Sequence, residues 1–208
     1  MARRKKPTFL RRLLRISVPA LLWLIFVWWY SNTGGPVTQP EINELMAVLE
    51  TRGTDPEQRE LLREFLQNDT GDDFVMLNLI ELNRNGSAED PLLDARSALD
   101  RYMEHMWPAL LKRACHPVSF GTTAANAIDL WGIDGANRWT QGAMMRYRSR
   151  RDLAQIVLDP DIQGPHEEKI AAMRKTIAIP LDPWFHMGDP RLLFGLIALV
   201  LSLIGMRR

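Results

Sequence analysis

Two of the four histidines stand where their side chains could take part in chemistry. His166 lies in the run Gly164-Pro165-His166-Glu167-Glu168 near an expected helix start, where a neutral imidazole could act as a general acid or base. A helix-capping or surface role is the alternative. His116 begins an expected strand and could face a cavity, with a satisfied structural role as its alternative. His166 is therefore a candidate catalytic residue, and both histidines are candidate ligand contacts.

The other two histidines are not taken as site residues. His105 precedes apolar Met106 on a long expected helix, which favours packing or solvent exposure. His186 follows Trp184 and Phe185, a combination that is typical of the boundary between a membrane and water.

Two expected strands contain a second set of candidates. Arg146 and Tyr147 are adjacent, so their side chains point to opposite faces and only one can line an interior. A buried arginine needs an anionic partner, which either the protein or a ligand could supply. Asn78, in an apolar strand, poses the same question because a buried amide needs hydrogen-bond partners. Ligand contact and a mutual bond both stay open, and Arg146 joins His166 as a candidate for catalysis.

Other kinds of site are missing from the sequence. The run from Arg146 to Arg151 looks like a phosphate-binding segment, but alternation along a strand disperses its charges and favours a solvated face. There is no spacing of metal ligands, no glycine-rich phosphate loop and no nucleophile elbow. Cys115 is the only cysteine, which excludes an intrachain disulfide. We expect no metal and no cofactor.

Charge is strongly segregated along the 208 residues. Ten of the 26 basic residues flank two apolar runs near the ends of the chain. The stretch between Ser31 and Pro190 holds the other 16 and all 25 acidic residues, which gives it a net charge of −9. Because an acidic domain repels phosphate backbones, nucleic-acid binding is not expected.

Each apolar run predicts a transmembrane helix. Ile16–Tyr30, with Leu13 and Leu14, makes roughly 18 residues or about 27 Å of helix, and it ends in an aromatic group. Leu192–Met206 is shorter and is entered through Pro190, which costs least at a first helical position. A cleaved signal peptide is the alternative for the first run, and a buried core helix for the second.

The flanking charges orient these two helices. Basic residues are retained on the cytoplasmic side, so both termini are expected in the cytoplasm of a bacterium and the acidic middle in the periplasm. The expected organisation is a basic tail (1–15), a transmembrane helix (16–30), a linker with an amphipathic helical pair (31–72), a main domain (73–182), an interfacial linker (183–191) and a second transmembrane helix (192–206).

The middle of the chain reads as a mixed α+β domain. We expect a helix at Pro40–Thr51 and a second helix around Leu61–Leu66, which begins behind a capping box at Thr54. The first strand follows at Phe74–Ile80. The remaining expected elements are a helix at Pro91–Ala114, a strand at His116–Thr122 that could continue to Trp131, a strand at Trp139–Arg148, a helix from Ser149 to Leu158, a helix ending near Arg174 after breaks at Pro160 and Gly164-Pro165, and a strand at Thr176–Leu181. The order β-α-β-β-α-β is the ferredoxin-like pattern, with four antiparallel strands and both helices on one face.

Several short motifs resemble a known family. They are Val75-Met76-Leu77-Asn78-Leu79, Tyr102, Trp107-Pro108, Trp139, the run Arg146 to Arg150, Asp159-Pro160, His166 and Ile179-Pro180. Together they resemble a small bacterial domain-of-unknown-function family of the dimeric α/β-barrel superfamily, over about Asp73 to Leu181. The chain departs from it in its membrane helices, its helical pair, Ala114-Cys115-His116 and the segment before Trp139.

The resemblance implies a homodimer, because the sheet face without helices pairs with a second copy. The wider superfamily includes cofactor-free monooxygenases, lactone isomerases, haem enzymes and ligand sensors without catalysis. We take as ligand-binding candidates Asn78, His116, Trp139, Arg146, Tyr147 and His166. Three hypotheses follow: a small-ligand-binding or accessory domain of a membrane complex, a cofactor-independent oxygenase or isomerase of a small hydrophobic substrate using His166 with Arg146, and a purely structural subunit.

Which sheet face is bare cannot be read from the first strand. One face would present Phe74, Met76 and Ile80 with Asn78, and the other would present Val75, Leu77 and Leu79. Both sets are largely apolar. We expect a homodimer to cover the bare face, with the helical pair Pro40–Asn68 folding back over it as the alternative.

Overall fold

The structure, a computed structural model, describes residues 9–184 and 188–207, and side chains outside 9–12, 163, 165 and 207 within these ranges. It divides into a terminal unit, Met1–Thr33 with Trp184–Arg208, and a domain unit, Gly34–Pro183. The interface prediction for His186 lies outside the described residues, as do the basic residues from Arg3 to Lys6.

The terminal unit is a pair of helices, α1 (Phe9–Tyr30) and α7 (Pro190–Arg207). The phenyl rings of Phe26 and Phe194 meet edge to face at 4.7 Å, and the Trp23 indole N–H donates to the Arg191 carbonyl at 2.8 Å. Gly195 leaves room for the Trp23 ring, since a Cβ there would lie 3.0 Å from the indole nitrogen. Near the other end, the Ser202 hydroxyl donates to the Ile16 carbonyl at 3.3 Å, so the two helices run antiparallel.

Among the described helices, one is long and apolar enough to cross a bilayer. That segment is Leu13–Tyr30, with a mean hydropathy of 1.7, whereas the apolar part of α7, Pro190–Met206, is shorter. The length and composition of α1 therefore agree with the first expected transmembrane helix, whereas α7 is shorter than a helix that spans a bilayer.

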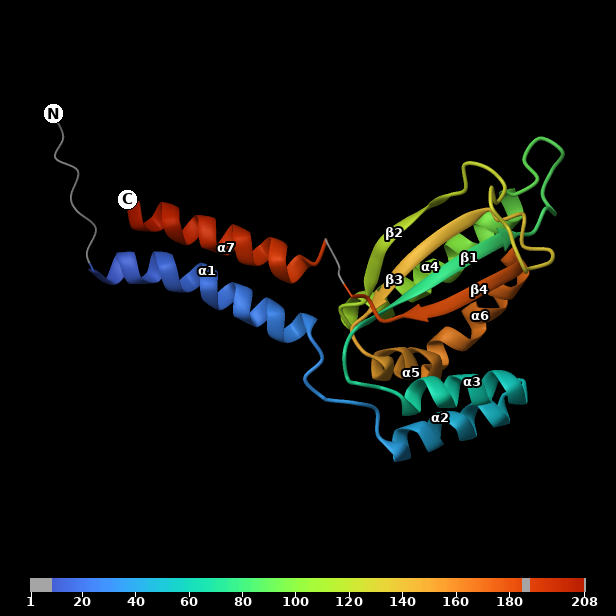
Figure 1. Cartoon of the computed structure of the whole chain (residues 1–208), viewed down its shortest axis with the longest axis horizontal. Coiled ribbons are helices and arrows are strands. Elements are labelled where there is room, and N and C mark those ends of the chain that lie inside the picture. The colour runs from blue at the N-terminus through green and yellow to red at the C-terminus, as the bar shows by residue number, and fades with distance from the viewer. Residues whose placement is uncertain (1–8, 185–187, 208) are drawn as a thin grey trace. The chain divides into compact units, whose positions relative to one another are not determined.

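The domain unit is built on a four-stranded antiparallel sheet in the order β2-β3-β1-β4. The strands are β1 (Phe74–Leu82), β2 (His116–Thr122), β3 (Gln141–Tyr147) and β4 (Met173–Leu181). The helices α4 (Leu93–Lys112), α5 (Arg150–Leu158) and α6 (Pro160–Ala172) lie along the sheet in Figure 1. This confirms an α+β domain with a four-stranded antiparallel sheet, and Pro160 begins the second of two helices between β3 and β4.

The core identifies the face that these helices cover. Phe74 and Tyr147 pack with Met106 and Leu110 of α4, Ile156 of α5 and Ile162 of α6. Directly paired residues of adjacent strands share a face. Phe74, Met76, Asn78 and Ile80 therefore lie on the helix side, and the other face, which we call the open face, carries Val75, Leu77 and Leu79 of β1 with Leu181, Ile179 and Ile177 of β4 and Met144 of β3.

Three sequence predictions need correction in this unit. β2 stops at Thr122 because its ladder with β3 ends at the pair Thr122–Gln141, so the proposed continuation to Trp131 is wrong. β3 spans Gln141–Tyr147, so it begins later and ends one residue earlier than the expected strand Trp139–Arg148. The expected break at Gly164-Pro165 is also wrong, because α6 runs through both residues and ends at Ala172.

The leading helices α2 (Gln39–Thr51) and α3 (Pro56–Gln67) form as predicted. The cap of α3 is Asp55 rather than Thr54, and its carboxylate accepts from the backbone amides of Glu57 and Gln58. Ile42, Leu45, Met46, Leu49 and Leu66 pack against Ala154, Val157 and Leu158 of α5. The pair therefore lies on the helix layer (Figure 1) rather than over the open face, which corrects the lid alternative.

Three arginines hold the helical pair to α5. Arg52 donates to the carbonyls of Val157 and Leu158 at the C-terminal end of α5. Arg150 donates to the Phe65 carbonyl, and its guanidinium lies 4.3 Å from the Phe65 ring centroid. Arg151 pairs with Glu41 of α2 at 2.6 Å.

The Arg151–Glu41 contact makes the unfolding free energy of the domain depend on pH. The hydrogen bond from Arg151 lowers the pKa of Glu41 from 4.5 to about 2, so its stabilising contribution is present above pH 4.5 and is lost as pH falls toward 2. Because the Glu41 side chain is 38% exposed, solvent screening limits the loss to about 1 kcal/mol. We expect Glu41→Gln to lower the unfolding free energy at pH 7 and to match the wild type near pH 2, measured by urea unfolding. A deficit that is independent of pH would contradict this assignment.

Candidate functional site

Two of the candidates belong to the helix side of the sheet. The Tyr147 ring stacks on Phe74 at 5.2 Å and 10°, and burial raises the pKa of its phenol. The Asn78 amide donates to the Met76 carbonyl at 3.1 Å. Tyr147 is therefore part of the hydrophobic core, and the partly buried amide of Asn78 bonds to its own strand.

Arg146 and His116 are neighbours at one end of the open face. They are direct partners in the β2–β3 register. Arg146 is 1% exposed; its Nε donates to Asp73 Oδ2 at 2.7 Å and a terminal nitrogen donates to the Ala114 carbonyl at 2.8 Å. His116 Nδ1 lies 3.0 Å from the Pro117 carbonyl, which can only accept a hydrogen bond. The anionic partner required by a buried arginine is thus Asp73 of the protein.

His166 lies on α6, on the opposite side of the sheet from Arg146. Its side chain is exposed, and partial desolvation, together with the charges of Lys169 and Arg52, lowers the pKa of its imidazole. A neutral ring at physiological pH is what a general base requires. However, the structure does not bring Arg146 near it within the chain, because the sheet separates them. The structure likewise does not join Asn78 to Arg146.

Trp139 lies at the other end of the open face, in a cluster that sequence reasoning missed. Lys175 Nζ lies 4.5 Å from the Trp139 ring centroid and 3.3 Å from Glu81 Oε2. The Glu81 side chain is 3% exposed and also pairs with Arg174 at 3.1 Å. The signal was present in the sequence, since Glu81 is a charged residue within an apolar strand run. Two cations contact one buried carboxylate, so the cluster joins the end of β1 to the start of β4.

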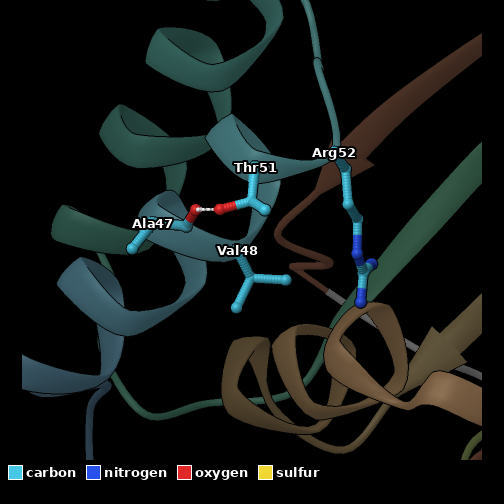
Figure 2. Close-up of a pocket in the computed structure, with 4 residues that line it drawn as sticks. All are labelled: Ala47, Val48, Thr51 and Arg52. Atoms are coloured by element: carbon cyan, nitrogen blue, oxygen red, sulfur yellow. Dashed lines mark hydrogen bonds between the residues drawn. The ribbon is translucent and has the colours of Figure 1, made fainter.

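The α2 helix borders a shallow depression of about 360 Å³ (Figure 2). Its lining residues are Ala47, Val48, Thr51 and Arg52. The Thr51 hydroxyl donates to the Ala47 carbonyl at 2.9 Å, and Arg52 is engaged by α5 as described above. No candidate residue lines this depression, and within the described part of the chain no three His, Cys, Asp or Glu side chains gather as metal ligands would.

Comparisons with known proteins support the fold of the domain. No family model and no curated protein matches the chain. A protein of unknown function from Rhodopseudomonas palustris is 21% identical, with a TM-score of 0.50, covering 61% of this chain and 94% of that one. Its methylated form gives 20% identity, 63% and 94% coverage and the same TM-score. At these identities the likeness shows the fold and carries no chemistry.

The solved structure of another protein is more distant. It is a dimeric protein of unknown function and ferredoxin-like fold from Bacteroides fragilis, 8% identical, with a TM-score of 0.36, covering 53% of this chain and 96% of that one. At this distance the similarity carries no argument, so function must be argued from the chain's own surfaces.

Proposed function

We propose that the chain is a membrane-anchored, extracytoplasmic domain that pairs with a second copy through its open sheet face and has a small-ligand-binding or accessory role. The observation that carries this proposal is the apolar character of the open face. Leu77, Leu79 and Ile177 are partly exposed there, and Ile179 and Leu181 are 44% and 37% exposed. A second copy that presents the same face would remove these side chains from water.

Two such faces brought together would enclose a space suited to a small hydrophobic molecule. The centre of each face is aliphatic, while His116 lies at one end and Lys175 with Trp139 at the other. Ligand sites are commonly apolar with a few polar groups that fix orientation. His116 and Trp139, both on the open face, are therefore the ligand contacts that we favour among the original candidates.

The anchoring part of the proposal rests on the surface of the terminal unit. Leu21, Leu22 and Leu24 of α1 and Leu199 and Leu201 of α7 are each more than half exposed. Lipid tails would satisfy such a surface and water would not. The antiparallel packing of α1 and α7 is what two spans with both termini in the cytoplasm require, and the acidic domain unit is then periplasmic. A further membrane-complex partner fits the accessory role.

Catalysis is the less favoured role because His166 and Arg146 lie on opposite sides of the sheet. The proposed dimer does not bring this pair together, since joining the open faces leaves α6 of both subunits on the outer side. A purely structural subunit would instead have a completely filled space between the two sheets. Native mass spectrometry of the dimer separates these roles: a retained small molecule supports binding, and an empty dimer supports the structural role.

Leu77→Asp tests the pairing itself. A carboxylate placed in the middle of an apolar interface must be desolvated without a partner, so we expect the dimer to weaken at least about 100-fold. Sedimentation of the full chain in mild detergent measures the dissociation constant. Leu61→Asp, at a 61% exposed position of α3, is the matched control and should leave it unchanged. A wild-type monomer at micromolar concentration would remove the dimer from the proposal.

A further inference from the structure

The connection between β2 and β3, residues 123–140, carries large apolar side chains at its tip. Ile128 is 98% exposed and Trp131 is 94% exposed, and Ile133 and Leu130 are also exposed, at 57% and 40%. Single exposed apolar residues are ordinary, but four within six residues concentrate exposed apolar area in one short segment, which is typical of an interaction site. Figure 1 shows the connection as the yellow segment that joins the two strands.

Hydrogen bonds hold the base of this connection in place. The Ala127 amide donates to the Asn137 carbonyl at 2.9 Å, and the Thr123 amide donates to the Thr140 carbonyl at 3.0 Å. The Trp139 indole N–H donates to the Ala136 carbonyl at 2.7 Å. Gly132 and Gly135 both adopt positive φ, which turns the chain at the tip. Preorganisation of this kind lowers the entropy lost on binding.

The base is also continuous with the open face. Lys175, an open-face residue of β4, donates to the Gly135 carbonyl and lies over the Trp139 ring. Whatever covers the open face therefore meets the connection at its edge.

The charge of the tip excludes a bilayer surface as the favoured occupant. Asp129 and Asp134 flank Leu130, Trp131 and Ile133, and no lysine or arginine occurs between Ala124 and Asn137. Peripheral segments that bind anionic lipid are basic, so an acidic tip would be repelled.

The area of the open face points to a second copy as the occupant. A stable interface needs about 800 Å² per partner, of which a little more than half, roughly 450 Å², is apolar. A fully exposed Ile or Leu offers roughly 60–120 Å², so the partly buried open face supplies on the order of 200 Å². The tip adds roughly 400 Å², about half of it from Trp131. The open face and the tip together reach the apolar area that a dimer interface of this size needs.

We infer that residues 127–137 form an arm that clasps the second copy of the chain, with Trp131 as its anchor. This inference rests on the dimer proposed above. The arm explains how a modest sheet face could hold two subunits together. It also assigns a role to the segment before Trp139, which departs from the pattern of the resembled family.

The first experiment compares Ile128→Ser/Trp131→Ser with Ile170→Ser, a 64% exposed position of α6, in the full chain in mild detergent. We expect the double variant to weaken the dimer at least tenfold in sedimentation, and Ile170→Ser to leave it unchanged. A monomeric wild type would defeat the dimer and the arm together. A dimeric wild type with an unaffected double variant would defeat the arm alone.

The second experiment identifies what the tip touches. A benzophenone amino acid in place of Trp131 should, on illumination in cells, give an adduct of two copies of the 23.9 kDa chain. An adduct with lipid, or with a different protein, would overturn the assignment of the second copy. The same probe in place of Ile170 should give no adduct of two copies.

Discussion

Arg146→Ala is expected to cost the domain about 3–5 kcal/mol of unfolding free energy, because it leaves a carboxylate and a carbonyl without their partner. The Arg146 side chain is 1% exposed and donates to Asp73 and to the Ala114 carbonyl. These two bonds join β3 to the start of β1 and to the turn before β2. Ala114 itself has a φ of 55°, so this turn depends on the contact to hold an unfavourable backbone conformation. Arg96→Ala is the matched control, since the Arg96–Asp90 pair is 46% and 39% exposed and such pairs contribute about 1 kcal/mol or less.

Cys115 reports on this unfolding without an added probe. Its thiol is fully buried, and burial raises its pKa to about 11, so a thiol reagent reacts only when the domain opens. The denaturant concentration at which Cys115 becomes reactive should fall sharply in Arg146→Ala and barely change in Arg96→Ala. If the two variants behaved alike, Arg146 would not be structural and would return to the list of ligand contacts.

The order of elements was predictable because each one is encoded locally. Apolar runs bounded by turn residues marked the four strands, and Pro160 marked the division between α5 and α6. The capping residue Ser149 was also correct, since its hydroxyl accepts from the Asp152 amide. Hydrophobic periodicity and the positions of turn and capping residues can be read from the sequence without knowing the tertiary fold.

The positions of the charged side chains were not predictable, because their partners are distant in sequence. Arg146 pairs with Asp73, which is 73 residues away in sequence, and Arg174 pairs with Glu81, which is 93 residues away. Strand alternation predicted that Arg146 and Tyr147 face opposite ways, which is confirmed, but not that Tyr147 is the one in the core. The docking of α2 and α3 on α5 was missed for the same reason, since their apolar stripes fit either surface.

Membrane topology gives the sharpest expected contrast. A cysteine introduced at Ser87, an exposed position between β1 and α4, should react with a membrane-impermeant thiol reagent in intact spheroplasts. One introduced at Ala2 should react only after the membrane is made permeable. The expected reason is the segregation of charge, since nine basic residues lie on the terminal sides of the two apolar runs, where the proposed topology retains them in the cytoplasm and carries the acidic domain across.

The structure refines the choice of positions for this experiment. Ala136 is 8% exposed, and a cysteine there would label poorly on either side of the membrane, so it is unsuitable. Native Cys115 can stay, because its buried thiol adds no background in the folded chain. Labelling at Ala2 but not at Ser87 in intact spheroplasts would place the domain in the cytoplasm. A chain shortened by loss of the first apolar run would identify that run as a cleaved signal, with α7 as the remaining attachment.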